Sequence, residues 1–281
     1  MNDLMMSFNG NEQYITKDEI REMAPLAFAD TPTNPDLSKK YLFVNTETII
    51  DDLNKLGWLP VQAAQRKSRK EGGTIFSKHM IAFQNPEIKI TSGDGDDAYP
   101  RILLTNSHDG MQAFKFSVGI YRMVCSNGLV VADEEFSDFK IKHKGYSFSE
   151  LRDVVRQAVE DLPNKVQIMN DMKSKILTQE EKNKLALDAM LIRANITPGS
   201  EKAKAFNYDA ETIEDILDPK REEDKGNDLW RVFNVVQEKI TQGDFHAALT
   251  GAKVRKVRKI KSFEKDIKVN QQLFKLATSL V

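Results

Sequence analysis

The sequence predicts an α+β fold: a β-rich meander sheet with a packed helix, followed by a mainly helical C-terminal half. Apolar residues recur at every second position from Phe114 to Ile120, the period of a strand with one buried face. After Ser147 the apolar spacing becomes helical. This change of period divides the chain into an N-terminal arm (1–40), a β-rich α+β core (41–146) and a mainly helical region with a basic C-terminal segment (147–281).

Capping residues locate the first helices. Thr16 and Glu19 have the spacing of a capping box and predict a helix that a proline-rich loop follows. A second helix is expected from Thr46 and ends before Gly57, which suits the position just past a helix end. Its apolar face is made of Ile49, Ile50, Leu53 and Leu56.

Several strands and helices follow from the same patterns. A hairpin is expected from strands 58–65 and 74–83, joined by the polar loop 66–73. The other predicted strands are 88–90, 102–104, 114–124 and 139–141. Ser147 and Glu150 form another capping box sequence. The helices expected beyond the one that it opens are 166–177, 182–194, 210–217 and 228–241, and the charged connection 218–227 is expected to be exposed and mobile.

Composition excludes several protein classes. The 281 residues suffice for one large core or two smaller ones, and a single cysteine excludes a disulfide framework. No apolar run approaches the roughly 18 residues of a membrane span, and the N-terminus lacks a signal-peptide pattern, so we expect a cytoplasmic protein without a membrane partner. The 41 basic and 42 acidic residues give no overall attraction to nucleic acid, so local charge clusters matter more.

Two basic clusters are candidates for nucleic-acid contact. Six of the nine residues from Lys253 to Lys261 are basic, and the apolar ones recur every third position. A second cluster lies at the predicted hairpin tip, where side chains can reach a phosphate backbone. The basic residues of the two clusters are Lys253, Arg255, Lys256, Arg258, Lys259 and Lys261, and Arg66, Lys67, Arg69 and Lys70. Both clusters are equally consistent with ordinary solvated surface.

The aromatic residues of the β-rich core could stack on bases. They include Trp58, Phe76, Phe83, Tyr99 and Tyr121. Most of them fit a place in the core, and only Tyr121 is on the more polar face of its predicted strand.

The loop from Asn106 to Gly110 combines turn-forming and titratable residues. His108 and Asp109 suit a general base or a metal ligand, but Asn, Asp and Gly are also the residues that a tight turn needs. His79, His108 and His143 match no local metal motif, so we expect neither a metal nor another cofactor. Cys125 fits a buried structural thiol.

The order of several motifs resembles a known family. These are the runs 106–110, 122–129 and 140–143, and the later helix from Leu229 to Glu238. Together they resemble the phage/plasmid-like family catalogued as domain of unknown function nine-three-two. The residues that carry the resemblance are Asn106, His108, Asp109, Gly110, Arg122, Cys125, Asn127, His143, Trp230 and Asn234. The resemblance implies a mobile-element or bacteriophage origin, but no agreed activity.

A second likeness is to single-strand annealing recombinases, in which a helix also leads directly into a strand and a hairpin. From the two basic clusters and the family context, we expect a non-enzymatic DNA-binding protein that favours single-stranded DNA and assists replication or recombination, with annealing requiring a homo-oligomer. One alternative is a metal-assisted hydrolase or nuclease that uses His108, Asp109 and His143. Another is a host-directed factor, such as an anti-defence protein, that binds a host protein.

Overall fold

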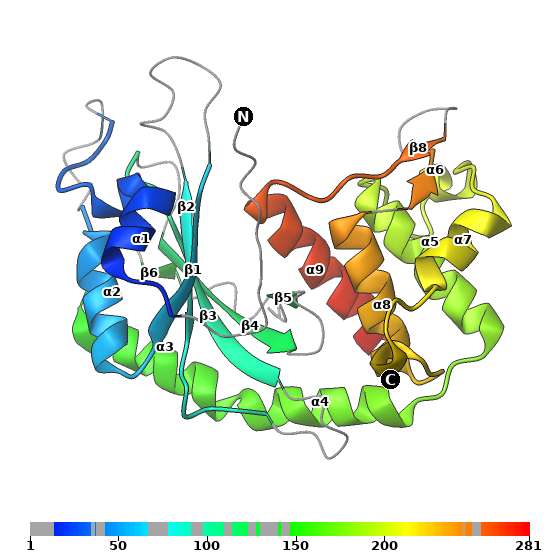
Figure 1. Ribbon diagram of the computed structural model, residues 1–281, viewed down its shortest axis with the longest axis horizontal. Helices are drawn as coiled ribbons and strands as arrows, with labels where there is room; N and C mark the ends of the chain where they lie inside the picture. Colours follow the sequence, from blue (N-terminus) through cyan, green and yellow to red (C-terminus); the bar gives the residue numbers. More distant parts are fainter. Residues whose placement is uncertain are drawn as a thin grey trace. The chain divides into compact units, whose positions relative to one another are not determined.

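The computed structural model of the chain divides into two compact units, Met1–Leu162 and Pro163–Val281 (Figure 1). The structure describes residues 14–34, 37, 43–66, 78–90, 98–109, 114–122, 128–129, 140–141, 147–243, 245–248 and 254–281. Among the helices of these ranges, none has both the length and the apolar character needed to cross a membrane. The α+β prediction is confirmed: a sheet lies in the first unit, and helices dominate the second.

The first unit is built on an antiparallel sheet. Four strands follow one another as a meander, and two short strands both pair with β4. The strands are β1 (Leu59–Gln65), β2 (His79–Gln84), β3 (Ala98–Asn106), β4 (Phe114–Arg122), β5 (Gly128–Leu129) and β6 (Lys140–Ile141). The predicted strand 88–90 is wrong, because only Ile90 forms an isolated bridge, with Ala98.

Three helices of the first unit contribute to one apolar core with the sheet. They are α1 (Lys17–Met23), α2 (Thr46–Lys55) and α3 (Phe148–Glu160). The Thr16 capping box is present, and Gly57 after α2 has a φ of 81°, as the sequence predicts. Ile20, Ala24 and Ala27 are completely buried, so this part of the N-terminal segment packs into the core.

The second unit is a cluster of helices around aromatic residues. Its helices are α4 (Leu162–Ser174), α5 (Gln179–Arg193), α6 (Glu201–Lys204), α7 (Ala210–Leu217), α8 (Leu229–Gln242) and α9 (Phe263–Thr278). Phe233 of α8 contacts Trp230 and, edge to face, Phe274 of α9, with ring centroids 6.5 and 6.2 Å apart. The bounds of α7 match the prediction, whereas α9 was not predicted.

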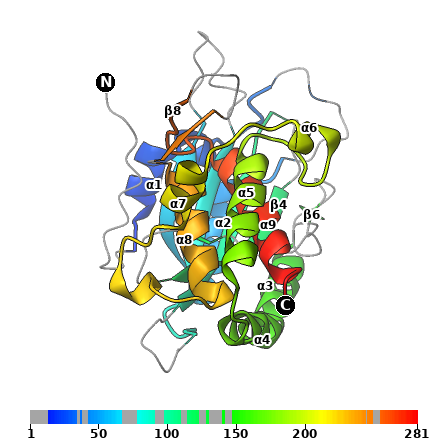
Figure 2. The ribbon, with the colours of Figure 1, turned by 90° about the vertical axis from the view of Figure 1, so that its right-hand side faces the viewer.

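Two short strands of the second unit, β7 (His246–Ala247) and β8 (Arg255–Lys256), pair antiparallel. The chain between β8 and α9 is extended, and Figure 2 shows this part of the unit from a second direction. The predicted basic cluster therefore lies on a strand and an extended segment that lead into a helix.

Candidate nucleic-acid interface

The extended chain from Arg255 to Lys261, here called the basic segment, has alternating burial. Val257 and Ile260 are 7% and 6% exposed. Arg255, Lys256, Arg258 and Lys261 are exposed, and Lys259 is half-buried. The apolar spacing noted in the sequence is thus the spacing of two buried side chains, Val257 and Ile260, with exposed cations before, between and after them. Lys253 lies outside the described residues.

Backbone hydrogen bonds fix the basic segment to the end of α8. The Val257 N–H donates to Phe245 O at 2.7 Å, and the Ile260 N–H donates to Thr241 O at 2.8 Å. Arg193 of α5 donates from Nη2 to Arg258 O at 2.8 Å. These contacts hold the backbone in one place, so its cations are presented in a fixed order.

Gly243 allows the basic segment to lie this close to α8. It has φ 77° and ψ −143°, a region that residues with a side chain almost never adopt. A methyl group at this position would lie 2.5 Å from Val257 O and 2.7 Å from the Arg258 carbonyl carbon. Both obstacles are backbone, so neither can rotate away.

One carboxylate, that of Asp266, interacts with the charge of Lys259 in the basic segment. Burial raises the pKa of Asp266 to about 6, although the neighbouring charges of Lys259 and Arg193 oppose the rise. Burial also lowers the pKa of Arg193, and Asp266 partly offsets this effect. Lys259 and Arg193 thus interact with an acidic group, whereas Arg255, Lys256, Arg258 and Lys261 are exposed.

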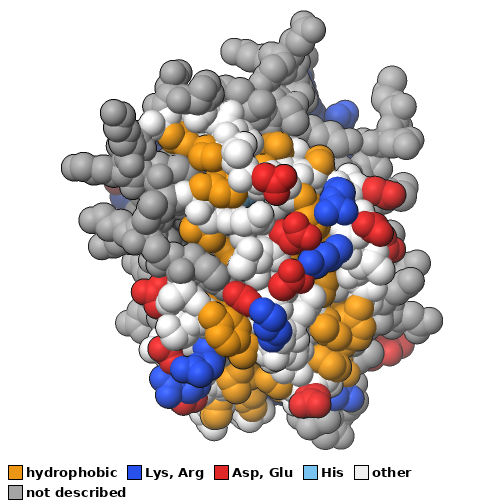
Figure 3. Space-filling view, turned by 90° about the vertical axis from the view of Figure 1, so that its left-hand side faces the viewer, with side chains coloured by type: hydrophobic (Ala, Val, Ile, Leu, Met, Phe, Trp, Pro, Cys, Tyr) orange, Lys and Arg blue, Asp and Glu red, His pale blue; other side chains and the backbone are white. Residues whose placement is uncertain are grey.

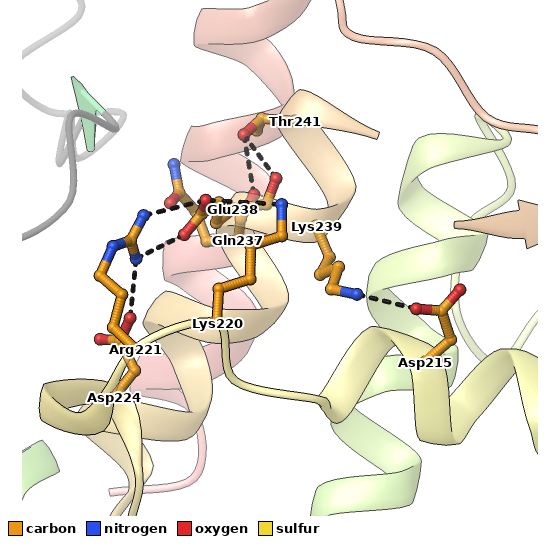
Figure 4. Close-up of polar contacts among 8 residues, drawn as sticks. All are labelled: Asp215, Lys220, Arg221, Asp224, Gln237, Glu238, Lys239 and Thr241. Carbon is orange, nitrogen blue, oxygen red and sulfur yellow. Dashed lines mark hydrogen bonds and ion pairs between the residues drawn. The ribbon is translucent and has the colours of Figure 1, made fainter. Parts of the chain in front are cut away.

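Several other charged side chains of the second unit form ion pairs with one another (Figure 4). Arg221 contacts both Glu238 on α8 and Asp224, at 2.7 and 2.8 Å. Lys239 is buried and contacts Asp215 at 2.7 Å. Asp224 is also buried, so the expectation of an exposed and mobile connection at 218–227 is wrong for this part of it.

The predicted functional loop of the first unit is buried. Asn106, Ser107, His108 and Asp109 are at most 2% exposed. Ser107 Oγ donates to Asp109 Oδ1 at 2.6 Å, and Asn34 Nδ2 donates to the Asp109 carbonyl at 3.3 Å. Gly110 lies outside the described residues. The loop is therefore held inside the fold.

A buried hydroxyl, that of Thr46, joins this loop to α2 and β2. Thr46 Oγ1 lies 3.0 Å from His79 Nε2 and 3.2 Å from His108 Nε2, and it accepts from Asn106 Nδ2 at 3.1 Å. His79 and Asn106 are partners across β2 and β3, which brings the residues together. We call Thr46, His79, Asn106 and His108 the Thr46 cluster.

The two histidines have different hydrogen-bonding roles toward the Thr46 hydroxyl. The hydroxyl has one proton and two lone pairs, and Asn106 occupies one lone pair. One imidazole must then donate to the oxygen while the other accepts its proton. Burial, with a smaller contribution from His108, lowers the pKa of His79 to about 3. His79 is therefore neutral at pH 7.

The described residues contain no group of three His, Cys, Asp or Glu side chains arranged to hold a metal ion. His79 and His108 do lie together, with ring centroids 5.0 Å apart, but both Nε2 atoms face Thr46. His143 lies outside the described residues. Within them, the cluster acts as a hydrogen-bonded connection between helix and sheet.

The remaining predicted residues fall into four groups. Trp58 and Phe83 are core residues, and Tyr99 is half-buried beside Lys89. Trp230 and Asn234 are buried in α8, where Asn234 Nδ2 donates to Trp230 O at 2.7 Å. Arg122 ends β4, and Arg66 is exposed where β1 ends. Lys67, Arg69, Lys70, Phe76, Cys125, Asn127 and the Tyr121 side chain lie outside the described part of the chain.

The described side chains on the face of the first unit that carries α1 and α2 include both acidic and basic residues (Figure 3). Figure 3 shows acidic and basic side chains beside one another there. Lys17 of α1, for example, contacts both Glu47 and Asp51 of α2, at 3.2 and 2.6 Å. This balance makes the basic segment of the second unit the better candidate interface.

The described residues define an α+β protein, and comparison with known proteins gives its family. Residues 36–274 match the family described as Domain of unknown function (DUF932), and the chain belongs to this family. The resemblance noted from the motifs is confirmed.

Two relatives come from Escherichia coli (strain K12). The UPF0380 proteins YafZ and YfjQ are 28% and 27% identical to this chain over 95% of its length and 92% of theirs. No solved structure gives a significant match. The likeness to single-strand annealing recombinases receives no support from these comparisons.

Proposed function

We propose that this chain binds nucleic acid through the basic segment, preferring single-stranded DNA, and assists replication or recombination of a mobile element without catalysing a reaction. The supporting observation is the anchoring of Val257 and Ile260, which leaves Arg255, Lys256, Arg258 and Lys261 exposed on a fixed backbone. A fixed row of cations can follow a phosphate backbone with little loss of conformational freedom on binding.

The charge of the segment is only partly compensated. No ion pair joins Arg255 or Arg258 to another residue of the described part of the chain. The charge of Asp266 acts on Lys259 and Arg193. When exposed cations contact phosphates, the counterions condensed on the nucleic acid are released. This release favours binding at low salt.

The alternative of a hydrolase has less support. Of its three proposed residues, His108 and Asp109 are buried and hydrogen-bonded within the first unit, and His143 lies outside the described residues. A host-directed protein partner has no distinguishing observation in the described residues, and it becomes the next hypothesis if DNA binding fails.

The test is fluorescence anisotropy of the full chain with a labelled single-stranded oligonucleotide, over about 50 to 200 mM salt. The test variant replaces Arg255, Lys256, Arg258 and Lys261 with Gln. Each phosphate contact to a single strand contributes about 0.7 to the slope of log affinity against log salt, so the slope should fall by about 3.

The matched control replaces two exposed arginines and two exposed lysines elsewhere with Gln: Lys55, Arg152, Arg156 and Lys184. This variant has the same change in net charge and should retain the wild-type slope. Equal slopes for the wild type and the segment variant would exclude the basic segment as the binding site. Absence of wild-type binding at low salt would exclude the proposed function.

A further inference from the structure

We infer that Tyr208 stacks on a base of the bound strand beside the basic segment, and that this contact gives the preference for single strands. The inference rests on the proposed function and names one of its specificity-determining residues. Tyr208 is 53% exposed, in the connection between α6 and α7. Its ring is the most exposed of the large aromatic side chains in the described part of the chain.

Hydrogen bonds hold this connection next to the β7–β8 hairpin. Asp209 caps α7 by accepting from the Thr212 N–H at 2.6 Å. Thr212 Oγ1 in turn donates to His246 O at 2.9 Å, and His246 is the strand partner of Lys256. Figures 1 and 2 both show the chain between α6 and α7 beside β8. The connection that carries Tyr208 thus lies beside the hairpin that carries Arg255 and Lys256.

The exposed side chains of this connection and hairpin suit the two parts of a nucleotide. Arg255 and Lys256 can contact phosphates, while the ring of Tyr208 and the 57% exposed Val254 offer apolar area. Asp209 and Glu211 are also exposed beside Tyr208 and would repel a phosphate. The strand would therefore run along the hairpin with a base, rather than its backbone, directed toward the tyrosine.

This arrangement distinguishes single strands from duplexes. In a duplex the faces of the bases are stacked on one another, so an exposed ring on a protein surface cannot reach them. In a single strand every base has a free face, and stacking on an aromatic side chain tolerates any sequence. Tyr208 should consequently add affinity for single-stranded DNA and none for duplex DNA.

The experiment compares the wild type with Tyr208→Ala and Tyr208→Phe, by anisotropy with single-stranded, duplex and abasic single-stranded oligonucleotides. Tyr208→Ala should weaken single-strand binding about tenfold, the effect of losing one stacked base. Duplex binding, binding to the abasic strand and the salt slope should stay unchanged. Tyr208→Phe should bind as the wild type does, because it keeps the aromatic face.

The control is Phe148→Ala, which removes another exposed aromatic side chain, in the first unit. It should leave all affinities unchanged. If the Gln variant of the basic segment loses its salt slope while Tyr208→Ala binds single strands normally, the stacking inference is wrong and the proposed function stands. If Tyr208→Ala weakens single-strand and abasic-strand binding equally, the tyrosine does not stack on a base. If the wild type does not bind DNA, both proposals fail.

Discussion

In the first unit, the polar side chains of the Thr46 cluster are almost completely buried and bonded to one another. In the second unit, the basic segment has the opposite arrangement: Val257 and Ile260 are buried and the cations face solvent. A buried polar group must satisfy its hydrogen bonds inside the protein, whereas an exposed cation is available to a partner.

The comparison separates residues that identify the family from residues suited to binding. Asn106 and His108 belong to the motifs that carry the family resemblance, yet their contacts join α2 to the sheet. The exposed cations of the basic segment carry none of that resemblance. We therefore expect changes in the Thr46 cluster to alter stability, and changes in the basic segment to alter binding.

The largest expected effect comes from Thr46→Val, which keeps the side-chain shape but removes the hydroxyl. His79, His108 and Asn106 would each lose a buried partner, so the free energy of unfolding should fall by about 4 kcal/mol. Urea denaturation measures this loss. Thr48→Val, on the exposed side of α2, is the matched control and should change stability by less than about 0.5 kcal/mol. Equal effects of the two variants would mean that the cluster is not a structural connection.

Gly243→Ala should have the next largest effect, and it changes no charge. The new methyl group would meet the backbone of Val257 and Arg258, which should lower the stability of the second unit by about 3 kcal/mol. Gly199→Ala is the control, because Gly199 also has positive φ, at 79°, but nothing lies within 4 Å of an added methyl group. It should cost only about 1 kcal/mol. DNA affinity should fall for Gly243→Ala alone, and an unchanged affinity would show that the position of the segment is unimportant.

The free energy of unfolding should depend on pH mainly through His79. Its pKa is about 3 in the folded chain and about 6.5 when unfolded, so the unfolded state binds more protons between these values. The contribution of neutral His79 to the free energy of unfolding should be fully present above about pH 7. It should decrease as the pH falls, by up to about 1.4 kcal/mol per pH unit. Denaturation at several pH values measures the slope. His79→Gln should flatten it, whereas the exposed His246 replaced by Gln should not.

Asp266 should give a smaller dependence of opposite sign in the second unit. Its folded pKa of about 6 exceeds the ordinary value of 3.8, so the folded state binds more protons between these values. This contribution increases stability as pH falls from about 6 to 4. Asp266→Asn should remove it, as followed by hydrogen exchange of α9. If α9 loses protection on acidification in the wild type and not in the variant, the sign assigned here is wrong.

Local signals predicted most of the helices. The Thr16 capping box, the start of α2 at Thr46 and the bounds of α7 all follow from patterns within a few residues. The missed helix α9 carries such a signal as well: Ser262 caps it, and Phe263, Val269, Leu273 and Phe274 form its buried face. The basic run just before α9 is the stronger local signal, and it predicts a charged surface rather than a helix.

The Thr46 cluster could not be predicted in the same way. Thr46 lies 33 residues from His79 and 62 from His108. The pairing of β2 with β3 brings His79 next to Asn106, and the packing of α2 on the sheet adds Thr46. The connection before α7, which carries Tyr208, likewise lies near the β7–β8 hairpin through the contact of Thr212 with His246, 34 residues away in sequence. The chemistry of individual side chains predicts which residue types can bind or react. The strand register and the packing of α7 determine which of these residues lie close together.

The most direct test of the division between the two regions is the salt slope of single-strand binding, measured side by side for the Gln variant of the basic segment and for Thr46→Val. Protein concentrations are corrected for the folded fraction. The slope should fall by about 3 for the segment variant and stay at the wild-type value for Thr46→Val. A wild-type slope for the segment variant, together with a reduced slope for Thr46→Val, would contradict the assignment of binding to the second unit.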